Sequence, residues 1–170
     1  MDHALTKGIY CYYESPIGRI FIATTDDGIS TLNFTDETVV EQTQVTTLHP
    51  FLQLVIVELN KYFSGNLKSF SVPLDPHGTD FQKKVWQAIL EIPYGNTISY
   101  SQLSATMGQP DAIRAIANAN ARNPVLILMP CHRVIGSSGE LTGYAGGLDR
   151  KKLLLELEGA IVPSSQLTLF

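Results

Sequence analysis

The sequence of 170 residues has few of the residues that build cross-linked or metal-bound scaffolds. Its two cysteines, Cys11 and Cys131, lie far apart and form no CxxC or zinc-type spacing. Its four histidines are scattered, so no metal site is expected. A disulfide scaffold is not expected either, which favours a reducing, cytoplasmic compartment.

Long apolar runs are missing as well. The first thirty residues contain no stretch typical of a signal peptide or long enough to cross a bilayer, so we expect no membrane partner. The net charge of −4 does not favour a nucleic-acid partner. The acidity is uneven, however: residues 1–75 hold four Lys or Arg against nine Asp or Glu, and residues 76–170 hold eight against seven. The second half could therefore bind DNA through a few phosphate contacts.

The first half predicts a small antiparallel sheet with one helix. Tight turns separate three runs rich in β-branched and aromatic residues, at positions 8–14, 19–24 and 28–34. Apolar residues at helical spacing follow Pro50 and stop at Gly65. Nothing in residues 1–75 looks catalytic, and residues 72–78, which contain two prolines, predict a linker. We therefore expect an N-terminal domain over residues 1–75 and a C-terminal domain over residues 76–170.

The second half predicts several helices. Thr79 and Ser99 each precede a glutamine by three residues, the pattern of a capping box, and Trp86 falls on the apolar face of the first helix. A short helix ending near Gly108 and a second helix starting at Pro110 form a helix-turn-helix outline.

The second helix of this outline, expected to run to about residue 121, has two distinct sides. Ala112, Ile113 and Ile116 would face the core. Arg114 and Asn118 would lie on the other side, together with Ala115, Asp111 and Arg122. Five alanines keep the helix slim, so a long cationic side chain could enter a groove. The alternative is an ordinary solvated arginine on an amphipathic helix.

The chemical centre is predicted at Cys131, which we expect at the end of a buried strand. A cysteine beside a histidine is a candidate activated nucleophile, and an inert structural thiol is the alternative. Neighbouring side chains in extended chain point apart, so a proton would pass from Cys131 to His132 through a bridging water. Glu158 falls on an apolar flank of the last helix and could orient that histidine or form a salt bridge with an arginine.

These segments resemble the O6-methylguanine-DNA methyltransferase (alkylguanine-DNA alkyltransferase) family. The match is carried by Pro-Cys-His-Arg-Val at 130–134, Arg-Asn-Pro-Val at 122–125, Thr-Gly-Tyr-Ala-Gly-Gly at 142–147 and Glu-Gly at 158–159. It is dense from about residue 74 to residue 159 and looser before that. The resemblance implies an α+β (α/β) fold, in which a ribonuclease H-like domain precedes a helical, winged-helix-like domain.

The resemblance also implies a function, DNA repair by single-use transfer of an alkyl group from O6-alkylguanine to Cys131. A relay through His132 and Glu158 would produce the thiolate, and Asn123 would brace the neighbouring turn. Tyr100 would donate to the flipped base, and Arg114 would fill the gap left in the duplex. The further implied contacts to substrate or DNA are Val134 and Cys131 through their carbonyls, Ala145 through its amide, and Tyr144, Ala115 and Asn118. We expect a monomer that uses no cofactor and binds double-stranded DNA.

Some positions depart from the family pattern, and rival functions remain open. Ala145 stands where some members have serine, and Leu126 where some have a proline in the pocket. Asp111 and Ala117 could weaken DNA binding. A lesion-binding relative without transfer activity would lack the cysteine that is present here. A Cys-His hydrolase would turn over esters, and a helix-turn-helix regulator would prefer a particular undamaged sequence.

Overall fold

The computed structural model describes residues 9–38 and 49–163 of the chain, and its contacts divide it into two compact units. The first unit comprises residues 1–78 together with Pro124–Leu128, and the second comprises Thr79–Asn123 and the chain from Met129 onward. A single boundary near residue 75 was expected, so the return of residues 124–128 to the first unit is a new feature. No helix among the described residues is long and apolar enough to cross a membrane.

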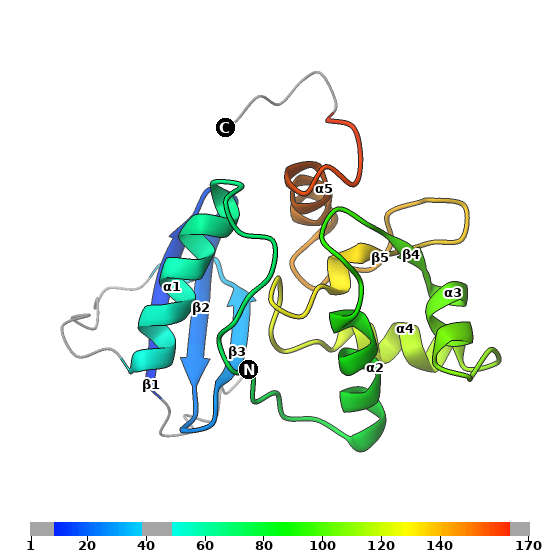
Figure 1. Cartoon of the computed structure of the whole chain (residues 1–170), viewed down its shortest axis with the longest axis horizontal. Coiled ribbons are helices and arrows are strands. Elements are labelled where there is room, and N and C mark those ends of the chain that lie inside the picture. Colours follow the sequence, from blue (N-terminus) through cyan, green and yellow to red (C-terminus); the bar gives the residue numbers. More distant parts are fainter. Residues whose placement is uncertain (1–8, 39–48, 164–170) are drawn as a thin grey trace. The chain divides into compact units, whose positions relative to one another are not determined.

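The first unit is a three-stranded antiparallel sheet with one helix packed on it (Figure 1). The strands are β1 (Ile9–Ser15), β2 (Gly18–Thr24) and β3 (Ile29–Phe34), joined in sequence order as the turns predicted. Helix α1 (Pro50–Phe63) begins at the predicted proline, and the side chain of His49 accepts a hydrogen bond from its first turn. Alternate residues of β2 and one side of α1 form the core, which includes Ile20, Ile22, Leu52, Val55 and Leu59.

The outer edge of β3 is closed by two short segments. Ile29 pairs with Leu74, and Leu32 pairs with Val125, each as an isolated parallel bridge. A side chain at Gly28 would clash with the carbonyl of Pro73, so glycine permits this close approach. Because Leu74 pairs with β3, the prediction of a linker over residues 72–78 is wrong for its first half. This pairing leaves fewer unpaired backbone groups at the edge of the sheet.

The second unit contains four helices and a two-stranded parallel pair. Helix α2 (Asp80–Leu90) packs against α4 (Ile113–Ala121), and the indole Nε1 of Trp86 donates to the carbonyl of Ala119 at 2.9 Å. Both predicted capping boxes form, at the starts of α2 and of α3 (Tyr100–Thr106). The remaining elements are β4 (Ile98–Ser99), η2 (Cys131–Arg133), β5 (Val134–Ile135) and α5 (Leu148–Leu157).

Helices α3 and α4 form the expected helix-turn-helix outline, but α4 starts later than predicted. Residues 110–112 form a turn, closed by a bond from the Ala112 amide to the Gln109 carbonyl, and α4 has no side-chain cap. Ile113 was expected in the core, but it is the first residue of α4 and is 39% exposed. The buried stripe of α4 is therefore short: Ile116, Ala119 and Asn120.

Candidate active site

Cys131 lies in a tight helical turn and not at the end of a strand, so that part of the prediction is wrong. The apolar run before it is buried, but only Val125 pairs with a strand. Two local turns follow, in which Leu128 and Cys131 each donate to the carbonyl two residues earlier. Ile127 has a φ of 70°, a left-handed conformation that is costly for a β-branched residue. The chain thus turns sharply and leaves the Cys131 side chain buried, at 2% exposure.

His132 and Glu158 meet in the interior of the second unit. The side chains are fully buried, and the imidazole Nε2 lies 2.8 Å from Oε1 of Glu158. Glu158 is the C-cap residue of α5, so the end of this helix places the carboxylate beside the turn that carries His132. The predicted contact between imidazole and carboxylate is therefore present.

Arg133 shares the same carboxylate. Its Nε donates to Oε2 of Glu158 at 2.8 Å, its Nη2 donates to Oε1 at 3.0 Å, and its Nη1 donates to the carbonyl of Ile92 at 2.6 Å. The amide of Gly95 also donates to Oε2. The two partners weighed for Glu158, a histidine and an arginine, thus occur together.

The charges of this cluster shift the pKa values of Glu158 and His132. Burial raises the pKa of Glu158, but hydrogen bonds and charges from His132 and Arg133 outweigh it and hold the pKa at about 2. Burial lowers the pKa of His132, and the nearby cations Arg133 and Lys151 add to this, against the pull of Glu158. A neutral imidazole beside an ionised carboxylate donates from Nε2, so Nδ1 is left as an acceptor. Nδ1 is buried and has no hydrogen-bond partner among the described residues.

The thiol itself is not ionised by its surroundings at rest. Burial raises the pKa of Cys131 to about 11, while the Asn123 side chain and the charge of Lys151 pull it down. A buried thiol must therefore lose its proton to a neighbouring base as it reacts. The free acceptor on His132 is suited to that role.

Three other predicted residues lie around the thiol. The Nδ2 group of Asn123 donates to the carbonyl of Met129 at 2.7 Å, which braces the turn before Cys131. The hydroxyl of Tyr100 accepts a hydrogen bond from the Asn120 side chain at 3.4 Å and interacts electrostatically with Cys131. Tyr144 is buried edge-on to the His132 ring, and its hydroxyl has no partner among the described residues.

The predicted DNA-facing residues lie on the surface of the second unit. Arg114, Ala115 and Asn118 are exposed on α4, and Asn118 accepts from Arg122 at 3.1 Å. Ala145 is exposed. The carbonyls assigned to base recognition are already engaged, since that of Cys131 accepts from the Val134 amide and that of Val134 accepts from Lys151. A carbonyl has two lone pairs, so one remains on each for a further donor.

Lys151 is a residue of this site that sequence reasoning missed. It is completely buried on α5, and its Nζ donates to the carbonyls of Val134 and Thr142. The signal was available, because Lys151 is spaced three or four residues from Leu154 and Leu155, on the apolar flank that drew attention to Glu158. The next residue of α5, Lys152, pairs with Glu156 at 3.9 Å, and the Glu156 side chain is only 9% exposed.

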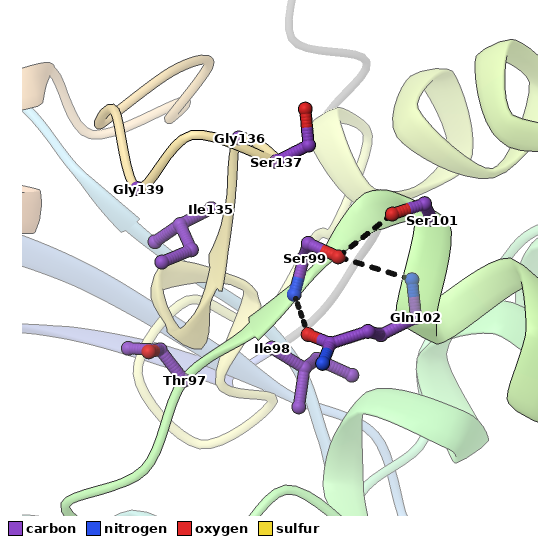
Figure 2. Close-up of a pocket in the computed structure, with 9 residues that line it drawn as sticks. All are labelled: Thr97, Ile98, Ser99, Ser101, Gln102, Ile135, Gly136, Ser137 and Gly139. Atoms are coloured by element: carbon purple, nitrogen blue, oxygen red, sulfur yellow. Dashed lines mark hydrogen bonds between the residues drawn. The ribbon is translucent and has the colours of Figure 1, made fainter.

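A polar hollow lies elsewhere on the second unit, beside β4 and β5 (Figure 2). Ser99, Ser101 and Gln102 of the α3 start line it and bond to one another, and Ile135 and Gly139 lie opposite. It contains none of the predicted site residues. Within the described ranges, no group of three His, Cys, Asp or Glu side chains could hold a metal ion.

Comparison with known proteins identifies the family of the chain. The ribonuclease-like domain of 6-O-methylguanine DNA methyltransferase matches residues 9–76, and its DNA-binding domain matches residues 80–160. A "Methylated-DNA--protein-cysteine methyltransferase" of Methanosarcina acetivorans is 47% identical over 154 residues, covering 89% of this chain and 98% of its own. One of Mycobacterium bovis is 45% identical over 162 residues, covering 95% and 98%.

Solved structures agree with these matches. The O6-methylguanine methyltransferase of Mycobacterium tuberculosis superposes with a TM-score of 0.78 at 43% identity, covering 93% of this chain and 96% of its own. A structure of the same organism's protein in complex with DNA gives 0.76 at 46% identity, covering 89% and 92%. The predicted family and fold class are confirmed, and the chain belongs to the 6-O-methylguanine DNA methyltransferase family.

Proposed function

We propose that this protein repairs DNA by moving an alkyl group from the O6 atom of guanine onto its own Cys131, once per molecule. Membership of the family makes the chain a methylated-DNA–protein-cysteine methyltransferase and makes DNA its partner. The observation that carries the residue-level proposal is the buried pair of Glu158 and His132, the residue that follows Cys131, with Nδ1 of the imidazole left as an acceptor.

The transfer begins with loss of the thiol proton. The proton passes from Cys131 through one bridging water to Nδ1 of His132, and Glu158 stabilises the imidazolium that results. The sulfur then attacks the alkyl carbon in line, a sulfur–carbon bond forms, and the bond from that carbon to O6 breaks with its electron pair left on guanine. Tyr100 donates to a ring nitrogen and the Ala145 amide donates to O6 as this charge develops.

The product explains the single turnover. A thioether is a poor leaving group, and the other cysteine, Cys11, belongs to the first unit. We therefore expect each molecule to accept one alkyl group. Positioning of the base accounts for the rate in a reagent that is used once.

Access to the base requires that it leaves the stack, because the O6 substituent is enclosed inside the duplex. Arg114 lies exposed on α4, next to Ala115, so its side chain can enter a groove and occupy the gap. Asn118 and the backbone of α4 would contact the same strand region. Carbonyl groups of Cys131 and Val134 would accept from the guanine amino group, and Tyr144 would line the cavity.

The direct test is the intact mass of the protein after incubation with a duplex that contains O6-methylguanine. Wild type should gain the mass of one methylene and no more, even with excess duplex. Cys131→Ala should gain nothing, and Cys11→Ala should gain as much as wild type. An unmodified wild-type mass refutes the proposal, and repeated turnover in the presence of excess duplex refutes its single-use part.

The role of Arg114 has its own test. Arg114→Ala should slow transfer from duplex more than transfer from the same oligonucleotide as a single strand, in which no gap opens. Arg19→Ala, which removes an arginine of β2 bonded to Glu14, is the control and should leave both rates unchanged. Equal slowing on duplex and single strand would remove the gap-filling role.

A further inference from the structure

Lys151 is a buried lysine whose contacts indicate a role beyond packing. Its exposure is 0%, although a lysine side chain normally keeps its ammonium group in water. Its Nζ donates at 2.6 Å to the carbonyl of Val134 and at 2.7 Å to that of Thr142. One ammonium group thus joins two backbone segments that are eight residues apart.

Both segments belong to the site described above. Val134 directly follows the turn that carries Cys131, and its carbonyl is one of those assigned to the base. The Thr142 side chain lies near enough to the Tyr100 hydroxyl to lower the pKa of that tyrosine. The Lys151 ammonium therefore holds the residue that follows the turn of the nucleophile and a residue beside the tyrosine expected to donate to the leaving base.

The charge of Lys151 also acts on the thiol. Burial lowers the pKa of Lys151 to about 8, and its interaction with Cys131 raises it. Lys151 in turn lowers the pKa of Cys131 and that of His132. A cation close to a buried sulfur stabilises the thiolate far more than the neutral thiol.

We propose that Lys151 is a positioning residue of the transfer reaction, which holds the Val134 and Thr142 segments around Cys131 and stabilises the thiolate as it forms. This inference rests on the proposed function. It assigns to Lys151 a positive charge that is present near the sulfur before the thiol proton leaves, whereas His132 becomes cationic only by accepting that proton. The charge must be present for the reaction, whereas a spacer of the same length would suffice for packing.

Other ionisable groups surround this pair. They come from η2, α3, the loop before α5, and α5 itself: His132, Arg133, Tyr100, Tyr144, Arg150 and Glu158. The pKa values of both tyrosines are raised, that of His132 is lowered and that of Glu158 is about 2. Lys151 is therefore the group in this set whose charge changes near pH 8.

The expected dependence on pH follows. The pKa of the thiol is about 11 and that of His132 is lowered from 6.5, so the thiol and the neutral imidazole persist between pH 6.5 and 9.5 and the relay alone gives a flat rate. Loss of the Lys151 proton above about pH 8 removes the charge that stabilises the thiolate, so the rate should fall there. A lysine with a purely structural role would produce no such bend.

The experiment measures single-turnover methyl transfer from an O6-methylguanine duplex by intact mass between pH 6 and 9.5. Wild type should bend near pH 8. Lys151→Met should be about 10- to 1000-fold slower at pH 7, the range that loss of a neighbouring opposite charge produces, and its profile should show no bend. Lys152→Met, which removes the adjacent and partly exposed lysine, is the matched control and should follow wild type.

Lys151→Arg keeps both the charge and the donors, and it serves if the methionine variant does not fold. Its guanidinium stays protonated throughout, so its rate should stay level where that of wild type falls. Identical profiles for wild type and Lys151→Arg, or a wild-type profile without a bend, would overturn the role of Lys151 while leaving the transfer reaction intact. A wild type that gains no methyl group would refute the proposed function, and this inference with it.

Discussion

Each of the two units contains one buried cysteine, and the two differ in what surrounds them. Burial raises the pKa of Cys11 to about 11, and that of Cys131 to about the same value. Around Cys11, in the middle of β1, burial is the cause of the shift. Around Cys131, an amide side chain, a lysine and backbone donors oppose it. A cysteine that is only buried keeps an inert thiol. A buried cysteine becomes reactive when neighbouring groups can accept the thiol proton and stabilise the thiolate charge.

Among the described residues, each unit also contains one buried glutamate. Glu58 on α1 accepts from the amides of Ser71 and Val72 and from the Ser71 hydroxyl, and so fastens a loop to a helix. Glu158 accepts mainly from two side chains, one of which is the proposed base. The same residue type thus joins two backbone segments in one unit and, in the proposed relay, orients the base in the other.

The largest expected difference between the two units is the effect of a histidine substitution on the transfer rate. His132→Gln removes the acceptor for the thiol proton, and general-base catalysis contributes about 10²- to 10⁴-fold. Single-turnover transfer should slow by that factor. His49→Gln, at the start of α1, should leave the rate unchanged. A His132 variant that reacts at the wild-type rate would remove the relay from the mechanism.

The next effect concerns the stability of the two units. Glu158→Gln leaves Arg133 buried without its charge partner, which should cost about 3–5 kcal/mol of unfolding free energy. Glu58→Gln leaves buried donors poorly paired, at a cost of about 1–3 kcal/mol. Urea unfolding gives both values. Transfer should slow in the Glu158 variant and not in the folded Glu58 variant, and slowing in both would erase the distinction.

Acid should weaken the second unit in two steps. The folded-state pKa of His132 lies below its unfolded value of 6.5, so its contribution is present above pH 6.5 and is lost as pH falls below it. The pKa of Glu158 falls from 4.5 to about 2, so its contribution is lost as pH falls from about 4.5 to about 2. Urea midpoints should decrease through both windows. His132→Gln should abolish the first decrease, and a first step that persists in this variant would assign it to another group.

The smallest effect compares one buried and one exposed hydrogen bond. Trp86→Phe removes the bond to Ala119 inside the second unit and should cost about 1–2 kcal/mol. Tyr13→Phe removes the exposed bond to Asn60 in the first unit and should cost about 0.5 kcal/mol or less. Thermal unfolding measures both, and a larger loss in the tyrosine variant would contradict the ranking.

The sequence predicted what depends on local chemistry. Strand runs, turns, the helix after Pro50 and both capping boxes follow from residues within a few positions of one another, and all are present. The contact of His132 with Glu158 was anticipated because a carboxylate on an apolar flank needs a partner. Roles of the predicted site residues in catalysis and DNA binding stay predictions.

Features that do not follow from the preferences of single residues were missed. The turn at Cys131 depends on buried bends and on Ile127 in a conformation that its side chain disfavours, whereas the strand propensity of the apolar run predicted a strand. The pairing of Leu74 with β3 could not be inferred from two prolines. Lys151 was missed because a lysine on a helix is normally solvated, and only tertiary packing shows that its flank is enclosed.

The return of Pro124–Leu128 to the first unit has a practical consequence for anyone who cuts the chain. A fragment starting at Thr79 would still contain these five residues, but the Pro124 carbonyl and the Leu126 amide would lose their hydrogen bonds to Leu32. The buried side chains of Val125 and Leu126 would lose β3 as a neighbour, only a few positions before Cys131. The alkyl acceptor is therefore best studied with the molecule left whole.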